Sequence, residues 1–241
     1  MLQNPSDQAQ GPELPLRPLS EFDGSLSQRT YLALREAIMA LAIPPGAILR
    51  KPEICEALGV SRSPVSEAMA RLAGEGLVDI VPQAGSFVSR FSMAELREGA
   101  FLREAIELHA VAHVAGTITD ETLTILRRNI RIQEALVEDA DFAGFYAQDA
   151  ALHAVILDAT GFRRIAQVAE TAWVQVNRAR QLVLPVPGRV AETLEEHRAI
   201  LAALEARDAE AARAAMGHHL RQLMTFLQPL ERAHPEYFTS S

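Results

Sequence analysis

Only one of the 241 residues is a cysteine, Cys55. A single thiol cannot form an internal disulfide, and it excludes a zinc module built from several cysteines. The chain also lacks any apolar run near the roughly 20 residues that a membrane-spanning helix needs. Its first residues show neither the basic end nor the apolar stretch of a secretory signal. We therefore expect a cytoplasmic protein with no membrane partner.

Lysine is scarce as well, because Lys51 is the only one and arginine carries the rest of the positive charge. The formal net charge is −8, and an acidic chain as a whole does not attract DNA. The charge is uneven, however, since residues 25–91 carry seven basic and six acidic side chains. A locally basic face in this segment remains able to bind DNA.

The spacing of apolar residues divides the chain into four parts, and 49% hydrophobic residues suffice for a packed core. Residues 1–24 show no periodicity and are predicted to be a flexible tail. Residues 25–91 predict helices at 26–42, 52–58 and 64–75, then a hairpin of 77–81 and 86–90. Residues 92–232 predict an all-α antiparallel bundle of six or seven helices, and residues 233–241 a C-terminal tail. The helical pattern covers 93–116, 120–138, 141–158, 162–184, 188–206 and 208–228. The predicted fold class is thus mainly α.

The order helix, helix, turn, helix, hairpin in residues 26–90 is typical of a winged helix-turn-helix. Gly59, Val60 and Ser61 would form the turn, and a serine N-cap with Pro64 at the first helical position would begin the recognition helix. Hydroxyls and backbone N–H groups at a helix N-terminus suit phosphate oxygens, and an arginine there can bind guanine through two hydrogen bonds. The alternative is a three-helix core with an exposed arginine. The residues predicted to contact DNA are Arg35, Lys51, Ser61, Arg62, Ser63, Ser66, Arg71, Gln83 and Gly85.

Four residues with metal-ligating side chains fall on predicted core-facing stripes. Asp149 and His153 lie one helical turn apart and share a face. His197 and His219 lie eleven residues before and after the turn at Asp208, so an antiparallel hairpin would place them at equal height. Three imidazoles and a carboxylate suit a divalent metal, with Zn²⁺ first and Ni²⁺, Mn²⁺ or Fe²⁺ as further candidates. The alternative is a hydrogen-bonded polar cluster without metal.

Other readings of the histidines have less support in the sequence. His109 and His113 are also four residues apart, but no carboxylate lies at a matching level, and we predict that they lie at the surface. An open metal site could serve a metal-dependent hydrolase. However, the chain has no H-E-x-x-H motif, no nucleophile elbow and no evident general base. We therefore predict that the protein is not an enzyme.

Several short runs in the N-terminal part form a specific pattern: PG at 45–46, GVSRSPV at 59–65, EGLV at 75–78 and GSFV at 85–88. This pattern resembles the GntR family of bacterial transcription regulators. The resemblance implies a winged helix-turn-helix that binds double-stranded operator DNA. Many members have arginine where this chain has Ser66, and a basic residue where it has Pro52. Lys51 could replace one of these contacts.

The C-terminal part, over about residues 93–230, resembles the FCD ligand-binding domain of FadR-type GntR regulators. The matching runs are DAALH at 149–153, EHRAI at 196–200, and Asp208 with HL at 219–220. In the metal-binding branch of that family, one aspartate and three histidines hold a divalent metal. The matching residues here are Asp149, His153, His197 and His219.

The resemblance also implies an effector. Arg103 matches an arginine of the first FCD helix that often meets an effector carboxylate, although a surface ion pair with Glu107 is the alternative. Arg178 and Arg180 are weaker effector candidates than Arg103, since one of the two must face away, and of these two we predict Arg178 as the effector residue. We thus predict a regulator whose operator affinity is controlled by a small organic acid bound near the metal. A single, weakly basic helix-turn-helix unit binds DNA poorly, so we expect a homodimer on a pseudo-palindromic operator. A metal-stabilised regulator without an effector remains an alternative.

Overall fold

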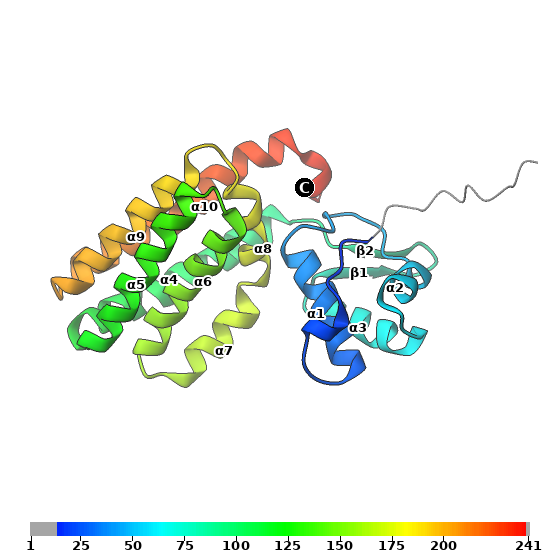
Figure 1. Ribbon diagram of the computed structural model, residues 1–241. Coiled ribbons are helices and arrows are strands. Elements are labelled where there is room, and N and C mark those ends of the chain that lie inside the picture. The colour runs from blue at the N-terminus through cyan, green and yellow to red at the C-terminus, as the bar shows by residue number, and fades with distance from the viewer. Residues whose placement is uncertain (1–13, 240–241) are drawn as a thin grey trace, which may run out of the picture. The chain divides into compact units, whose positions relative to one another are not determined.

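The computed structural model describes residues 14–239, without the side chains of residues 166, 170 and 171. The chain divides into two compact units, one ending at Ser89 and the other beginning at Arg90. The first holds helices and a β-hairpin, and the second holds helices (Figure 1). The predicted fold class is confirmed: a helix-turn-helix with a small β-hairpin wing, followed by a helical domain.

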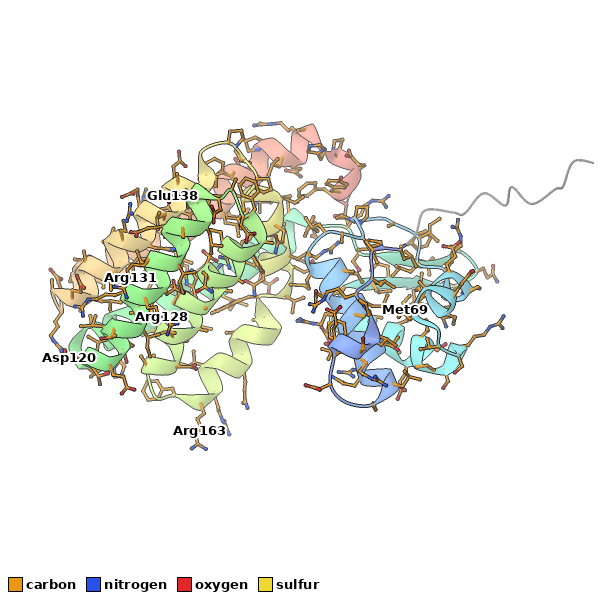
Figure 2. The ribbon with its side chains drawn as sticks, viewed as in Figure 1. Met69, Asp120, Arg128, Arg131, Glu138 and Arg163 are labelled. Atoms are coloured by element: carbon orange, nitrogen blue, oxygen red, sulfur yellow. The ribbon has the colours of Figure 1, made fainter. Side chains whose placement is uncertain are left out.

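The first unit is built on three helices whose apolar faces meet. Leu34, Ile38, Ile54 and Leu72 are fully buried, and Met69, labelled in Figure 2, packs with them on the buried face of the third helix. The hairpin strands pair antiparallel, with Val78 opposite Val88. The elements are α1 (Leu26–Met39), α2 (Lys51–Leu58), α3 (Arg62–Gly74), β1 (Val78–Val81) and β2 (Gly85–Val88).

The turn between α2 and α3 depends on Gly59, whose φ of 64° lies in the left-handed region that glycine adopts without a steric penalty. The recognition helix α3 begins earlier than predicted. Ser61 is the N-cap residue and Pro64 is the third helical residue, so the expected serine cap directly before Pro64 was wrong. The first four N–H groups of a helix have no intrahelical acceptor, and a proline at that position therefore removes no helical hydrogen bond.

Part of the predicted N-terminal tail is described. Leu19–Glu21 form one turn of 3₁₀ helix, and Arg17 pairs with Glu36 of α1 at 2.8 Å. Residues 1–13 lie outside the described part of the chain. Cys55, the lone cysteine, lies on α2 and is partly exposed.

The second unit contains seven α-helices within the described residues. Helix α10 packs along α4 and α9, and α5 packs against α6 and α9, which gives the bundle its antiparallel layers (Figure 1). None of the helices described is long and apolar enough to cross a membrane. The elements are α4 (Met93–Thr117), α5 (Asp120–Glu138), α6 (Phe142–Ala159), α7 (Arg163–Ala172), α8 (Val174–Val183), α9 (Arg189–Glu205) and α10 (Ala209–Ala233).

Two helix boundaries differ from the prediction. The expected single helix over residues 162–184 is two helices, because the chain turns at the buried Trp173. No glycine or proline marks this break in the sequence. Helix α8 then approaches α4 so closely that a Cβ at Gly99 would lie 2.8 Å from Val176. The last helix, expected to end at residue 228, continues through Pro229 to Ala233.

Candidate metal centre and DNA-reading surface

Four buried side chains from three helices converge inside the bundle. Helix α6 contributes Asp149 and His153, α9 contributes His197, and α10 contributes His219. One possible ligand atom from each residue lies within 4.8 Å of the others. The rings of His197 and His219 are 4.6 Å apart, as the equal distances from the turn at Asp208 require. The cluster consists of the four residues that the sequence singled out.

Each imidazole is held by a polar side chain behind it. Nδ1 of His219 lies 2.7 Å from a carboxylate oxygen of Glu196. Nδ1 of His197 lies 2.7 Å from the amide oxygen of Gln133, and Nδ1 of His153 bonds to the carboxylate of Glu107. These acceptors place the imidazole proton on Nδ1 and leave Nε2 with a free lone pair. The arrangement is typical of histidines that ligate a metal through Nε2.

The Nε2 atoms of His153 and His219 face one another, and in these tautomers neither has a hydrogen-bond donor among the described residues. Nε2 of His153 and Nε2 of His219 are 3.1 Å apart. In the tautomers set by the carboxylates, two lone pairs meet at this distance, and only a cation or an additional proton between them relieves the repulsion. Nε2 of His197 lies 3.2 Å from a carboxylate oxygen of Asp149. Among the described residues, this nitrogen and both Asp149 oxygens have no hydrogen-bond partner, although Arg180 forms an ion pair with Asp149.

The electrostatics of the site favour neutral imidazoles. Burial lowers the pKa of His197 and His219 well below the usual 6.5. Burial also lowers the pKa of His153, against the opposing effect of Glu107. Burial alone would raise the pKa of Glu107, but the charge of Arg103 and the hydrogen bonds from His153 and Arg103 hold it at about 2. The imidazoles are therefore in the form that binds metal, and the carboxylate behind His153 is ionised.

Two buried ion pairs support the carboxylates. Arg103 Nε lies 2.6 Å from Glu107, so this predicted pair exists but is buried, and the alternative of a surface ion pair was wrong. Arg189 binds Glu196 through two hydrogen bonds of 2.6 and 2.7 Å. Sequence reasoning missed Glu196, Gln133 and Arg189. The only signal in the sequence was that each is a polar residue at a core-facing helical position. That signal does not indicate which side chain it contacts.

The four residues fit a divalent metal. They provide three imidazole nitrogens and one carboxylate oxygen. In the described structure, the lone pairs that face one another accept no hydrogen bond from another group. This ligand set suits Zn²⁺ and also Ni²⁺, Mn²⁺ or Fe²⁺. Metals that accept more than four ligands keep positions open for a further donor.

A small cavity of about 30 Å³ adjoins the cluster. That volume holds one or two water molecules. Its lining includes three arginines from three helices, Arg103, Arg180 and Arg189, together with Asp149 and His219. Its remaining lining consists of Val183, Leu184, Thr193, Leu220 and Leu223.

The two predicted arginines of α8 face opposite ways, as their spacing of two residues requires. Arg180 lines the cavity. Arg178 is fully buried on the other side, with its guanidinium 4.6 Å from the centre of the Phe91 ring. The structure therefore places Arg103 and Arg180 at the cavity and Arg178 away from it. His109 and His113 are exposed on α4, where His113 stacks on Phe162.

The predicted DNA-contacting residues fall into two groups. One group is exposed or half-exposed around the start of α3 and at the hairpin tip, and Nζ of Lys51 lies 3.1 Å from Oγ of Ser66 within it. Its members are Lys51, Ser61, Arg62, Ser63, Ser66, Gln83 and Gly85.

The second group makes internal contacts between α1 and α3. Arg35 pairs with Glu75 at 2.9 Å. The guanidinium of Arg71 lies 3.7 Å from the centre of the Tyr31 ring and donates to Gln28 at 2.7 Å. These two arginines thus stabilise the packing of the three-helix unit at the end of α3 that is remote from the exposed serines.

Two family models match the chain. The model described as "Bacterial regulatory proteins, gntR family" matches residues 26–88, and the FCD domain model matches residues 98–222. The first match covers the helix-turn-helix and its hairpin, and the second covers all four residues of the metal-ligand cluster.

Known proteins resemble the chain over most of its length. It is 33% identical to an uncharacterised HTH-type transcriptional regulator of Streptomyces ambofaciens, over 92% of this chain and 94% of that protein. It is 30% identical to the HTH-type transcriptional repressor RspR of Escherichia coli, over 89% and 94% respectively. Its fold is similar to that of E. coli McbR/YncC, with a TM-score of 0.74, 24% identity, and coverage of 86% of this chain and 99% of that one.

Proposed function

Because the chain belongs to the GntR family of bacterial regulatory proteins and carries an FCD domain, we propose that a divalent metal and a small organic acid bound in its bundle control its affinity for operator DNA. The protein is a DNA-binding transcriptional regulator of the GntR/FCD type. This family consists of regulators and not enzymes, so the hydrolase alternative is set aside.

The proposal of a metal depends on one observation above all. Nε2 of His153 and Nε2 of His219 face each other at 3.1 Å while their Nδ1 atoms bond to carboxylates. A hydrogen-bonded cluster without metal would need an imidazolium there, but burial lowers the pKa of both rings. A metal cation satisfies both lone pairs at once. When bound, it would also offer its remaining positions to a carboxylate.

The charges around the cavity support an anionic effector. Around the cavity, the three buried carboxylates of Asp149, Glu107 and Glu196 each form an ion pair with one arginine, respectively Arg180, Arg103 and Arg189. A divalent metal therefore adds two positive charges that no buried side chain of this set compensates. Burying an uncompensated charge costs several kcal/mol, so a dianion such as a dicarboxylate or a hydroxy acid would be favoured. Arginine can bind such a carboxylate through two hydrogen bonds.

Binding of such an acid requires the cavity to widen, because about 30 Å³ does not hold a dicarboxylate. Leu184 and Arg189 line it where α8 meets α9. The acid would thus bind preferentially to a conformation in which these helix ends have moved. A ligand shifts an equilibrium only through such differential affinity.

We propose a homodimer as the DNA-binding form. An exposed stripe on α4 contains Leu102, His109 and His113, and it continues onto the exposed Phe162 that stacks on His113. Phe101 beside it is 72% exposed. Large exposed apolar side chains gathered on one face are typical of an interface, and a second copy of this chain fits a pseudo-palindromic operator. In each copy, Arg62 at the start of α3 is proposed to contact DNA.

The test begins with the metal. Protein purified without chelators is analysed for metal content, and thermal unfolding of the zinc-loaded form is then followed with malate or tartrate. An acid at about 100 times its dissociation constant should add roughly 2.7 kcal/mol of stability. Arg180→Gln should remove this stabilisation, while Arg198→Gln, an exposed arginine on α9, should retain it.

The second step measures DNA binding. Binding sites are selected from random duplexes with the purified protein, and their affinity is measured by anisotropy with and without the stabilising acid. A change in affinity supports the proposal. Metal binding with no response to any acid would favour the alternative, a metal-stabilised regulator without an effector.

A further inference from the structure

Within the part of the chain that the structure describes, the connection between the two units contains one residue, Arg90, whose backbone forms no hydrogen bond. Ser89 belongs to the first unit, where its N–H donates to the carbonyl of Leu77 at 3.0 Å and its hydroxyl donates to Asp79 at 2.9 Å. Phe91 belongs to the second unit. Its N–H donates to the carbonyl of Tyr237, and its carbonyl accepts from the N–H of Thr239, both at 2.9 Å. Arg90 alone separates these anchored positions.

The anchor on the second unit comes from the far end of the chain. Thr239 and Phe91 are 148 residues apart in sequence, and residues 91 and 238 form a parallel β-bridge. Arg90 takes part too, because its Nε donates to the carbonyl of Glu236 at 2.9 Å. In Figure 1 the red C-terminal segment lies beside the start of α4. The sequence predicted a tail from residue 233, but here Phe238 is only 5% exposed.

The side chain of Phe91 is held on two sides. Its ring lies 5.6 Å from that of Phe238, and the guanidinium of Arg178 lies 4.6 Å from its centre. Phe91 and Arg178 have no exposed surface. An aromatic pair and a desolvated cation–π contact each stabilise the position of the ring beyond the burial of apolar area. Phe91, the residue that follows the connection, is therefore held by side-chain contacts as well as by its backbone hydrogen bonds.

We infer that residues 235–239 are an intramolecular clasp that holds the hinge between the DNA-binding and effector-binding units. Arg178 supports the ring of Phe91, to which the clasp binds. The clasp confines rotation to the backbone of Arg90. Helix α8 contacts Phe91 through Arg178 and lines the cavity through Arg180, on opposite faces. Movement of α8 on ligand binding is thereby transmitted to Phe91. This last step depends on the proposed function, whereas the clasp itself does not.

Trypsin provides a direct test, since it cleaves after arginine and Arg90 is the hinge residue. Cleavage at Arg90 is measured by mass spectrometry in the full-length protein, relative to cleavage at Arg207 in the turn between α9 and α10. Phe238→Ala should speed cleavage at Arg90 about tenfold or more, because local opening exposes the bond. Phe238→Leu should restore most of the protection.

Tyr237→Ala is the matched control. Its ring is adjacent in sequence but stacks on His234 instead of Phe91, so its cleavage rate at Arg90 should stay within about twofold of wild type. Equal rates in Phe238→Ala and wild type would overturn the clasp. So would a uniform rise that includes Arg128 and Arg131, which lie on α5 (Figure 2), since general unfolding would then explain the result.

The transmission step has its own measurement. In wild type, zinc with malate should change the cleavage rate at Arg90 relative to protein treated with a chelator, and Arg178→Gln should abolish this difference. If the protein binds zinc and malate and the rate is unchanged, α8 does not transmit to the hinge. If wild type binds no metal, the proposed function fails, and the comparison of Phe238 and Tyr237 variants still decides on the clasp.

Discussion

Arg189 and Glu196 lie two helical turns apart on α9 and are joined by two parallel hydrogen bonds of 2.6 and 2.7 Å. The same carboxylate accepts from Nδ1 of His219 at 2.7 Å. A single glutamate thus fixes the tautomer of one candidate metal ligand, while a guanidinium holds that glutamate in place through two hydrogen bonds. Arg103, Glu107 and His153 repeat this order across α4 and α6.

Glu196→Gln should lower metal affinity by about 10–100-fold, because an amide oxygen is a weaker acceptor than a carboxylate and supports His219 less. Competition with a fluorescent zinc chelator measures the affinity. The neighbouring Glu195→Gln serves as the control, since that exposed side chain pairs with Arg198 and not with a histidine. Equal losses in the two variants would contradict the role given to Glu196.

Replacing His197 on α9 or His219 on α10 should abolish metal binding. His197→Ala and His219→Ala are each expected to reduce metal content after dialysis and to lower the melting temperature of the metal-loaded protein, since a metal that binds only the folded state stabilises it. Elemental analysis and calorimetry provide the readouts. Full occupancy in both variants would place the ligands elsewhere, with His109 and His113 as the next pair to test.

The metal-free protein should lose stability as the pH falls below about 6.5. Burial lowers the pKa of His153, His197 and His219 in the folded state, so the unfolded chain binds protons more readily. Each such histidine makes the free energy of unfolding fall by up to about 1.4 kcal/mol per pH unit. Urea unfolding at several pH values between about 7.5 and 5.5 measures this slope.

Replacing one of the three buried histidines should reduce that slope. His219→Gln is compared with His218→Gln, which removes an exposed ring one residue away. A slope that stays unchanged in His219→Gln would mean that this imidazole does not titrate as its burial requires.

Arg62→Ala should weaken operator binding by about 1–3 kcal/mol, because an exposed arginine at the start of α3 is placed to contact base edges or phosphate. Arg71→Ala offers a contrasting variant in the same helix. Its guanidinium packs on Tyr31, so it should lower the melting temperature more than the DNA affinity. Anisotropy titrations at fixed salt measure the affinity, and unchanged binding by a folded Arg62→Ala protein would remove Arg62 from the DNA contacts.

Helix spacing predicted much of this molecule. The stripe of Asp149 and His153, and the equal distances of His197 and His219 from Asp208, placed four distant residues together because helical periodicity and an antiparallel turn determine their relative height. The helix-turn-helix could also be predicted from the sequence, since the left-handed position at Gly59 and the cluster of serines are local signals.

Other features depend on contacts that periodicity does not encode. The break at Trp173 has no glycine or proline, and it follows from packing of the indole in the core. The partners behind the histidines, such as Gln133 on α5, are chosen by three-dimensional proximity across 64 residues of sequence. Arg35 and Arg71 were predicted to contact DNA, and spacing does not encode the internal partners that the structure gives them, because a charged residue near a helix end can contact either DNA or an internal partner.

The lone thiol of the chain makes the proposed rearrangement measurable by spectroscopy. Cys55 is partly exposed and lies on α2, the helix that precedes the recognition helix. One spin label or dye therefore attaches to each copy without any mutation. In the proposed dimer, two such labels report the separation of the two α2 helices. A change in their dipolar coupling would measure how far ligand binding in the buried cavity moves the two DNA-binding units relative to each other.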